Sequence, residues 1–362
     1  MKRALVVLLL VVVALAVFLF SKPTAVEPVA WEAPKPPSLL TGPYASNTRL
    51  RPIERVLKGE GRGPESIAVG RDGSLYTGYL DGRIVRFAEE ATSARVLSNG
   101  GGRPLGMAVH PDGRLIVADA VRGLVALDES VGLSVLAVEA GGVKLGFPDD
   151  VVIDRAGAFA YLTDASTKFG WGHDVDDILE HGAHGRLIRY EFATGQATVL
   201  LAGLEFANGV ALGPDDAFLL VAESGAYRVR RYWLAGPRAG QDEVFLDNLP
   251  GFPDNITWNG RDRFWIAMYT PRDRTLDTTS GRPFARKTLA RALARVGDRS
   301  PHYAMVFAFD PQGKLVANLQ YGGADAYGHI TSVLESGKWL WFGSLVEDAV
   351  GRMPLGLALA SH

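Results

Sequence analysis

The stretch PESIAVGRDGSLYTGYLDGRIVRF (residues 64–87) decides the fold, because its pattern returns along the chain. PLGMAVHPDGRLIVADAVRGLVAL (residues 104–127) has the same order of parts: a short apolar strand, an Asp-Gly turn, a second apolar strand, and then a third, more amphipathic strand. Glycine supplies the positive φ that such hairpin turns require. Each copy therefore predicts a set of paired antiparallel strands.

Further copies of this pattern begin near Pro148, Ala207, Pro253 and Gly328. Six such units match the radial repetition of a β-propeller. A parallel α/β fold needs helical periodicity between its strands, and this is mostly absent. A β-sandwich is the other alternative, but it does not require internal self-similarity. The sequence predicts an all-β, six-bladed β-propeller over residues 49–362.

The composition narrows the function classes. A chain of 362 residues can form one large all-β domain, and its 47% hydrophobic content is enough for a sizeable core. The net charge is −2 and the two signs are mixed, so no basic stripe exists for nucleic acid and we expect none as a partner. The absence of cysteine excludes disulfides, thiolate zinc sites and cysteine nucleophiles.

Residues 4–20 form an uninterrupted apolar run after Lys2 and Arg3. Such a run covers roughly 25 Å as a helix, at the short end of what crosses a bilayer. The apolar region of a cleaved signal peptide is shorter and ends in small residues, whereas this run ends in Phe18-Leu19-Phe20. We expect an uncleaved signal anchor, a transmembrane helix within residues 1–21. Lys2 and Arg3 would keep the N-terminus cytoplasmic and the propeller on the periplasmic or extracytoplasmic side.

Three segments lie outside the repeats. Residues 22–48 hold six prolines and no periodic apolar face, which predicts a semi-extended stalk. Insertions near residues 166–184 and 271–300 interrupt the third and fifth units, and such insertions often form a binding face or a cap. The second contains a basic amphipathic helix, for which a solvated face and contact with a bilayer both remain open.

Polar residues recur at one position of the repeats. The first strand of each propeller blade lines the central channel, and the residues at the starts of these strands are Glu65, Leu105, Asp149, Asn208, Asp254 and His329. Four of them carry oxygen donors, and the neighbours Asp150 and Asn255 add two more. Converging carboxylates raise one another's pKa, and hard cations such as Ca²⁺ take six to eight oxygen ligands. We expect a divalent ion there, with a metal-free polar plug as the alternative.

Several motifs, in the right order, resemble the strictosidine synthase-like proteins, and the layout with an N-terminal anchor is similar to that of the adipocyte plasma membrane-associated proteins. The resemblance covers about residues 45–355 and is carried by residues 63–67, 103–106, 161–166, 184–190, 206–210 and 252–256. The wider superfamily includes paraoxonases and gluconolactonases. The resemblance therefore implies a six-bladed, calcium-dependent lactonase fold.

The resemblance also implies residue roles. Glu65, Asn208, Asp254 and Asn255 match the ligands of the catalytic calcium, and Asp149 stands where an asparagine is usual. Asp150 matches an aspartate that helps to hold a second, structural calcium in paraoxonases. The paraoxonase histidine pair does not carry over.

These expectations combine into a membrane-anchored, calcium-dependent hydrolase of esters or lactones, of the arylesterase or lactonase type. The ion would act as a Lewis acid, Asp254 or Asp149 as the general base, and His329 as a lower-ranked proton carrier. Leu105, Phe169 and Trp171 are expected to contact a small apolar substrate.

Two alternatives stay open. The first is a strictosidine synthase-type lyase that condenses an amine with an aldehyde, a reaction for which that family uses a glutamate on the last blade. This chain has no aligned glutamate there, and Glu335 lies too far along its strand. The second alternative is a non-catalytic binding propeller, since one fold hosts many functions.

Overall fold

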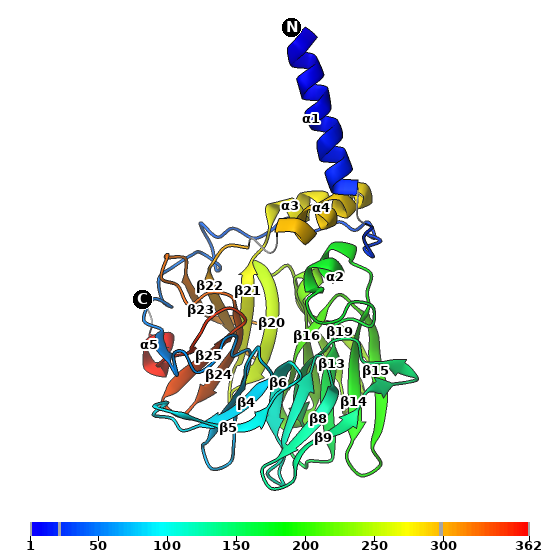
Figure 1. Cartoon of the computed structure of the whole chain (residues 1–362). Coiled ribbons are helices and arrows are strands. Elements are labelled where there is room, and N and C mark those ends of the chain that lie inside the picture. The colour runs from blue at the N-terminus through cyan, green and yellow to red at the C-terminus, as the bar shows by residue number, and fades with distance from the viewer. Residues whose placement is uncertain (1, 21–22, 297–299, 361–362) are drawn as a thin grey trace.

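Six four-stranded antiparallel sheets are arranged around one axis, as Figure 1 shows. The computed structural model describes residues 2–20, 23–296 and 300–360. The prediction of a six-bladed propeller is confirmed. In blades one to five, chain order equals strand order from the innermost strand to the edge.

The blades take their strands as follows. The first blade holds β2 (Ile67–Val69), β3 (Leu75–Gly78), β4 (Arg83–Phe87) and β5 (Ala94–Asn99). The second holds β6 (Pro104–Val109), β7 (Leu115–Asp119), β8 (Gly123–Asp128) and β9 (Gly132–Ala137). The third holds β12 (Pro148–Ile153), β13 (Phe159–Asp164), β14 (Gly185–Glu191) and β15 (Gln196–Leu204). The fourth holds β16 (Ala207–Leu212), β17 (Phe218–Glu223), β18 (Arg228–Trp233) and β19 (Asp242–Leu246). The fifth holds β20 (Gly251–Trp258), β21 (Phe264–Pro271), β22 (Ala304–Phe309) and β23 (Leu315–Tyr321).

The sixth blade joins the two ends of the propeller. Its strands are β24 (Ile330–Ser336), β25 (Trp339–Ser344), β26 (Val350–Pro354) and, at the edge, β1 (Glu54–Val56). β1 pairs antiparallel with β26, so a strand from the start of the domain completes the last sheet. The ring is thereby closed by backbone hydrogen bonds.

The innermost strands share a local irregularity. In blades two to six the register between the first and second strands shifts near the start of the inner strand, for example between Pro148 and Val151 and between Ala207 and Val210. A bulge of this kind turns a side chain away from its usual face. Gly106 and Gly209 lie in two of the bulges, where a Cβ would come within 2.1 Å of Asp150 and 2.4 Å of Asn255 of the next blade. Glycine is needed there because adjacent inner strands nearly touch.

The helices gather at one end of the propeller (Figure 1). They are α1 (Lys2–Phe20), α2 (Asp174–Glu180), α3 (Arg274–Thr279) and α4 (Pro283–Val296), while α5 (Leu355–Leu359) lies beside the sixth blade. The insertions thus form a cap, here called the cap helices α2 to α4, over one end of the channel. Residues 21–22 of the predicted anchor and stalk and residues 297–299 of the second insertion lie outside the described residues. In the described part of the chain, no helix is both long enough and apolar enough to span a membrane, so the anchor stays a prediction.

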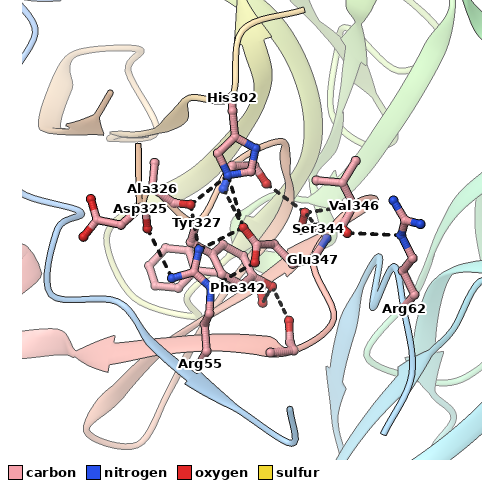
Figure 2. A network of polar contacts seen from close by, with 12 residues as sticks. Arg55, Arg62, His302, Asp325, Ala326, Tyr327, Phe342, Ser344, Val346 and Glu347 are labelled. Atoms are coloured by element: carbon pink, nitrogen blue, oxygen red, sulfur yellow. Dashed lines mark hydrogen bonds and ion pairs between the residues drawn. The ribbon is translucent and has the colours of Figure 1, made fainter. Parts of the chain in front are cut away.

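An ion pair between the partly buried Arg55 and the buried Glu347 supports the ring closure, and Figure 2 shows its contacts. Glu347, in the loop between β25 and β26, accepts hydrogen bonds from Arg55 Nε at 2.9 Å and Arg55 Nη2 at 3.0 Å, and from the Gly328 amide at 3.1 Å. His302 Nε2 lies 3.4 Å from Glu347 and 2.8 Å from the Ala326 carbonyl oxygen. Arg55 also donates to the Ala326 carbonyl. Glu347 therefore joins the first strand, the last blade and the loop before β24.

Replacing Glu347 by alanine should lower the free energy of unfolding by about 2–3 kcal/mol, because Arg55 and the Gly328 amide both lose a buried, charged acceptor. Urea unfolding measures this. The matched control is Glu54→Ala, which removes the exposed Glu54–Arg352 pair (3.1 Å) between β1 and β26 and should cost at most about 1 kcal/mol. Equal losses in the two variants would contradict the role given to Glu347.

Candidate functional site

A cavity of about 280 Å³ lies at the capped end of the channel. Its floor is formed by starts of inner strands, including Glu65, Leu105, Asp149, Asn208 and Asp254. These five residues come from five blades, and the structure brings them together as the repeat pattern predicts. The remaining inner strand contributes Thr331. The walls come from the cap helices, through Val175 and Ile178 of α2, Leu276 of α3, and Leu289 and Leu293 of α4.

Three aromatic rings surround the floor. Phe147, Phe206 and Phe252 line the cavity, and each lies two positions before an axial residue, namely Asp149, Asn208 and Asp254. Phe147 packs edge-on against Phe206 and against Trp171, with ring centroids 5.5 and 5.8 Å apart. Sequence reasoning missed these rings. Reading the position two residues before each axial residue would have found them.

Three buried oxygens stand out, two on the floor residues Glu65 and Asn208 and one on Asn255, which contacts Glu65 but does not itself line the cavity. In the part of the chain that the structure describes, Glu65 Oε2, Asn208 Oδ1 and Asn255 Oδ1 accept no hydrogen bond. Glu65 Oε1 accepts from Asn255 Nδ2 at 2.8 Å, which links the first and fifth blades. A buried acceptor without a donor costs free energy. Oxygens of this kind are the ligands that a hard divalent cation takes.

The carboxyl groups at the floor titrate abnormally. Burial raises the pKa of Glu65 to about 8, and the nearby Asp150 adds to this, while Arg103 and the Asn255 amide oppose it. Burial also raises the pKa of Asp149 and of Asp254 well above the usual range, with further increases from Glu65. Negative charge at this site is therefore unfavourable unless a cation is near.

A buried basic side chain, that of Arg103, lies next to the cavity lining. Arg103, which is 1% exposed, donates from Nη1 to the Gly63 carbonyl oxygen at 3.1 Å, and its guanidinium lies 4.9 Å from the centre of the Trp171 ring. Burial raises the pKa of both Glu65 and Asp149, and the charge of Arg103 offsets part of this increase. Arg103 occupies the repeat position that Phe147 occupies in the next blade. The sequence analysis did not assign it a role.

Two predicted contact residues do line the cavity, and a third does not. Leu105 and Trp171 are in the wall. Phe169 is buried instead among Val26, Leu179 and Ala290, inside the cap. Phe169 therefore lies outside the cavity lining, because the chain between Phe169 and Trp171 passes from the interior of the cap to its inner surface.

His329 also lies outside the cavity lining. Its backbone has a positive φ of 50°. Its ring is tilted against Tyr269, with centroids 4.7 Å apart, and lies edge-on to His302 at 5.6 Å. Tyr269 does line the cavity. The left-handed backbone at His329 places its ring against Tyr269, and Thr331 is the sixth-blade residue at the floor.

Asp150 has a different environment from the floor residues. Its Oδ1 accepts from the Val151 amide at 2.8 Å, and its Oδ2 accepts from the Val210 amide of the next blade at 2.9 Å. Burial raises its pKa to about 7. Both oxygens thus have protein donors, and Asp150 ties the third blade to the fourth.

Among the described residues, no three His, Cys, Asp or Glu side chains form a metal-binding group by themselves. A set of ligands here must therefore include amide oxygens, from Asn208 and Asn255, beside the carboxylates. The three acceptors without donors fit this mixed set.

Comparison with known proteins agrees with the propeller fold. Residues 149–237 match the family Strictosidine synthase, and residues 42–87 match Strictosidine synthase-like, N-terminal. The gluconolactonase of Xanthomonas campestris has a similar fold, with a TM-score of 0.61 at 17% identity over 92% of this chain and 98% of that one. The calcium-binding protein regucalcin from Agrobacterium tumefaciens follows at 0.57 and 14%, over 86% and 93%. At these identities the likeness concerns the fold alone.

Sequence relatives are much nearer. The adipocyte plasma membrane-associated protein of Rattus norvegicus is 33% identical over 91% of this chain and 93% of its own length. That of Salmo salar is 34% identical, over 86% and 78%. Strictosidine synthase-like 6 of Arabidopsis thaliana is 38% identical, over 81% and 79%. The chain belongs to the strictosidine synthase-like family, together with the adipocyte plasma membrane-associated proteins.

Proposed function

We propose that this protein is a membrane-anchored, calcium-dependent hydrolase that cleaves apolar esters or lactones at the axis of the propeller. The observation that carries the proposal is the set of three buried acceptor oxygens without donors, on Glu65, Asn208 and Asn255. Asp149 and Asp254 line the cavity floor together with Glu65 and Asn208, and Asn255 donates from Nδ2 to Glu65 Oε1. These five residues would hold the ion. The similarity in fold to a gluconolactonase and to a calcium-binding protein supports both the reaction class and the metal.

A bound divalent cation would supply the positive charge that polarises an ester carbonyl. The protein supplies the rest. The aromatic rings and the apolar side chains of the cap helices would hold the acyl or aryl part of the substrate and exclude water. Asp254 or Asp149 would take a proton from the attacking water as its oxygen bonds to the carbonyl carbon. The same group would return the proton to the leaving oxygen when the ester C–O bond breaks.

The cavity also bears on the lyase alternative. From the sixth blade, its described lining contains Thr331 and Leu345, and no carboxylate. Glu335 accepts instead from Trp265 Nε1 at 2.9 Å. A condensation that depends on a last-blade glutamate therefore finds less support than hydrolysis does.

Chelation should test the metal directly. Removing divalent ions from the wild-type protein should lower its melting temperature and abolish cleavage of aryl esters and lactones, since an ion at a hundredfold excess over its dissociation constant stabilises the native state by about 2.7 kcal/mol. Asp254→Ala should lose most of this response, whereas Asp149→Asn should weaken it but keep it, because the amide retains an oxygen ligand.

The control for the chelation experiment is Asp176→Asn, which removes a carboxylate from α2 that hydrogen-bonds His173 and should leave the response to chelator intact. A melting temperature and an activity that do not change on chelation would refute the metal. Binding without turnover of any ester would favour the non-catalytic propeller.

The raised pKa of Glu65 predicts a dependence on pH. In the presence of chelator, the unfolded chain releases the Glu65 proton near pH 4.5 while the folded protein holds it up to about pH 8. Stability should therefore fall as pH rises from about 5 to about 8. Excess Ca²⁺ should reverse the loss at pH 8. Glu65→Gln should make the fall shallower without abolishing it, because burial also raises the pKa of Asp149, Asp150 and Asp254. Thermal unfolding across this range is the measurement; stability that rises with pH in chelator would contradict the assignment.

Membrane anchoring rests on α1 and on the relatives. The apolar side chains of α1, such as Leu5 (71% exposed) and Val17 (64%), project from the protein, and the relatives are named as plasma membrane-associated. The full chain should float with phospholipid vesicles in a density gradient, and a chain that begins at Pro23 should stay at the bottom, because burial of apolar side chains in lipid drives the association. Flotation of the shorter chain would move the membrane contact to the propeller or its cap.

A further inference from the structure

The stalk lies along the cap. The Val29 amide donates to the Glu180 carbonyl oxygen of α2 at 2.8 Å, and the Trp31 amide donates to the Ser280 carbonyl oxygen, next to α3, at 3.2 Å. Arg272 Nη2 donates to the Pro34 carbonyl oxygen at 2.6 Å. Backbone contacts therefore run along the stalk on the cap side of the propeller.

Val26 joins the stalk to the interior of the cap. Its side chain is fully buried and packs with Phe169, Leu179 and Ala290. The same cluster contains four residues that also line the cavity, namely Val175, Leu276, Leu289 and Leu293. One layer of side chains thus has the stalk on one side and the cavity on the other.

Trp31 makes a second side-chain contact between the stalk and the cap helices. Its ring stacks on His181, the residue that ends α2, with centroids 4.0 Å apart and an angle of 9°. The guanidinium of Arg286 lies 6.0 Å from the Trp31 ring and donates to the carbonyls of Leu179 in α2 and Leu276 in α3. Arg286 belongs to α4, so all three cap helices meet beneath this tryptophan.

The cap helices need such support. α2 has 7 residues and α3 has 6, and helices this short are not stable in water without tertiary packing. The position of the cavity wall therefore depends on what packs against the outer side of these helices, and part of that packing is the stalk.

We propose that the stalk segment 26–34 positions the cap helices, and that Val26 and Trp31 thereby set which substrates the cavity accepts. Neither residue lines the cavity, so both act through the cap. Loosening the cap should weaken binding of a long acyl chain that reaches the walls, and should spare a short acetyl ester that occupies only the floor. The statement on selectivity rests on the proposed hydrolase function; the statement on positioning does not.

Hydrogen–deuterium exchange on the full chain tests the positioning. Val26→Ala and Trp31→Ala should each speed amide exchange in α2 and α4 by about tenfold or more, because these helices open locally, while exchange in the inner strands stays as in wild type and shows that the propeller is folded. Trp31→Phe, which keeps a stacking ring, should restore wild-type exchange. Leu40→Ala, at a stalk residue that is 91% exposed, is the matched control and should change nothing. Unchanged exchange in α2 and α4 in both alanine variants would overturn the proposal.

Kinetics test the selectivity. In the two alanine variants KM for a long-chain aryl ester should rise by about tenfold, which corresponds to about 1.4 kcal/mol of lost binding, while kcat for the aryl acetate stays within about twofold. Equal changes for both esters would overturn the selectivity. If no variant and no wild-type protein cleaves any ester, yet the cap exchanges faster in the alanine variants, the positioning role stands and the proposed hydrolase function falls.

Discussion

The close approach of six inner strands around one axis is the constraint on which the site depends. Neighbouring inner strands come so near that Gly106 and Gly209 have no room for a Cβ against the next blade. The register shifts beside these glycines turn the preceding side chains toward the axis. Leu105 and Asn208 reach the cavity for this reason, and Asp149 and Asp254 reach it through the same irregularity in their own blades.

The same closure creates an electrostatic asymmetry. Arg103 lowers the pKa of Glu65 and Asp149, so the side of the floor formed by the first three blades carries some compensation. For Asp254 burial raises the pKa, the charged neighbours Glu65, Asp149 and Asp150 raise it further, and the Asn255 amide opposes them. Ionisation of Asp254 therefore depends most on a cation that the chain does not supply. This is why Asp254 is the side chain that best separates a metal site from a polar plug.

Much of this architecture could be predicted from the sequence, because residues with the same structural role recur at the same position of each repeat. The number of blades and the axial residues Glu65, Asp149, Asn208 and Asp254 follow from aligning the copies. The roles of Arg103 and of the aromatic rings could be read from the same alignment, two positions earlier. His329 is different: it holds the axial place in the pattern, but a left-handed backbone at this residue turns its ring against Tyr269.

The cap could not be predicted in the same way. The insertions occur once each, so no second copy shows which of their side chains face inward. Phe169 and Trp171 are separated by a single residue, yet Phe169 is buried inside the cap and Trp171 lines the cavity. The stalk has no periodic apolar face, because an extended segment that crosses helix ends needs only isolated contacts such as Val26.

The substrate selectivity proposed above would therefore depend on other segments of the chain than those that form the floor of the cavity. Each of the six repeats supplies one residue to the floor, the two insertions form walls of the cavity, and the stalk packs against the cap helices without lining the cavity. α1 and the cap helices lie at the same end of the propeller (Figure 1), so the stalk joins the N-terminal helix to the wall of the cavity along a short path. α1 also contacts α4 directly, so the N-terminal helix and the stalk both adjoin the cap helices that wall the cavity.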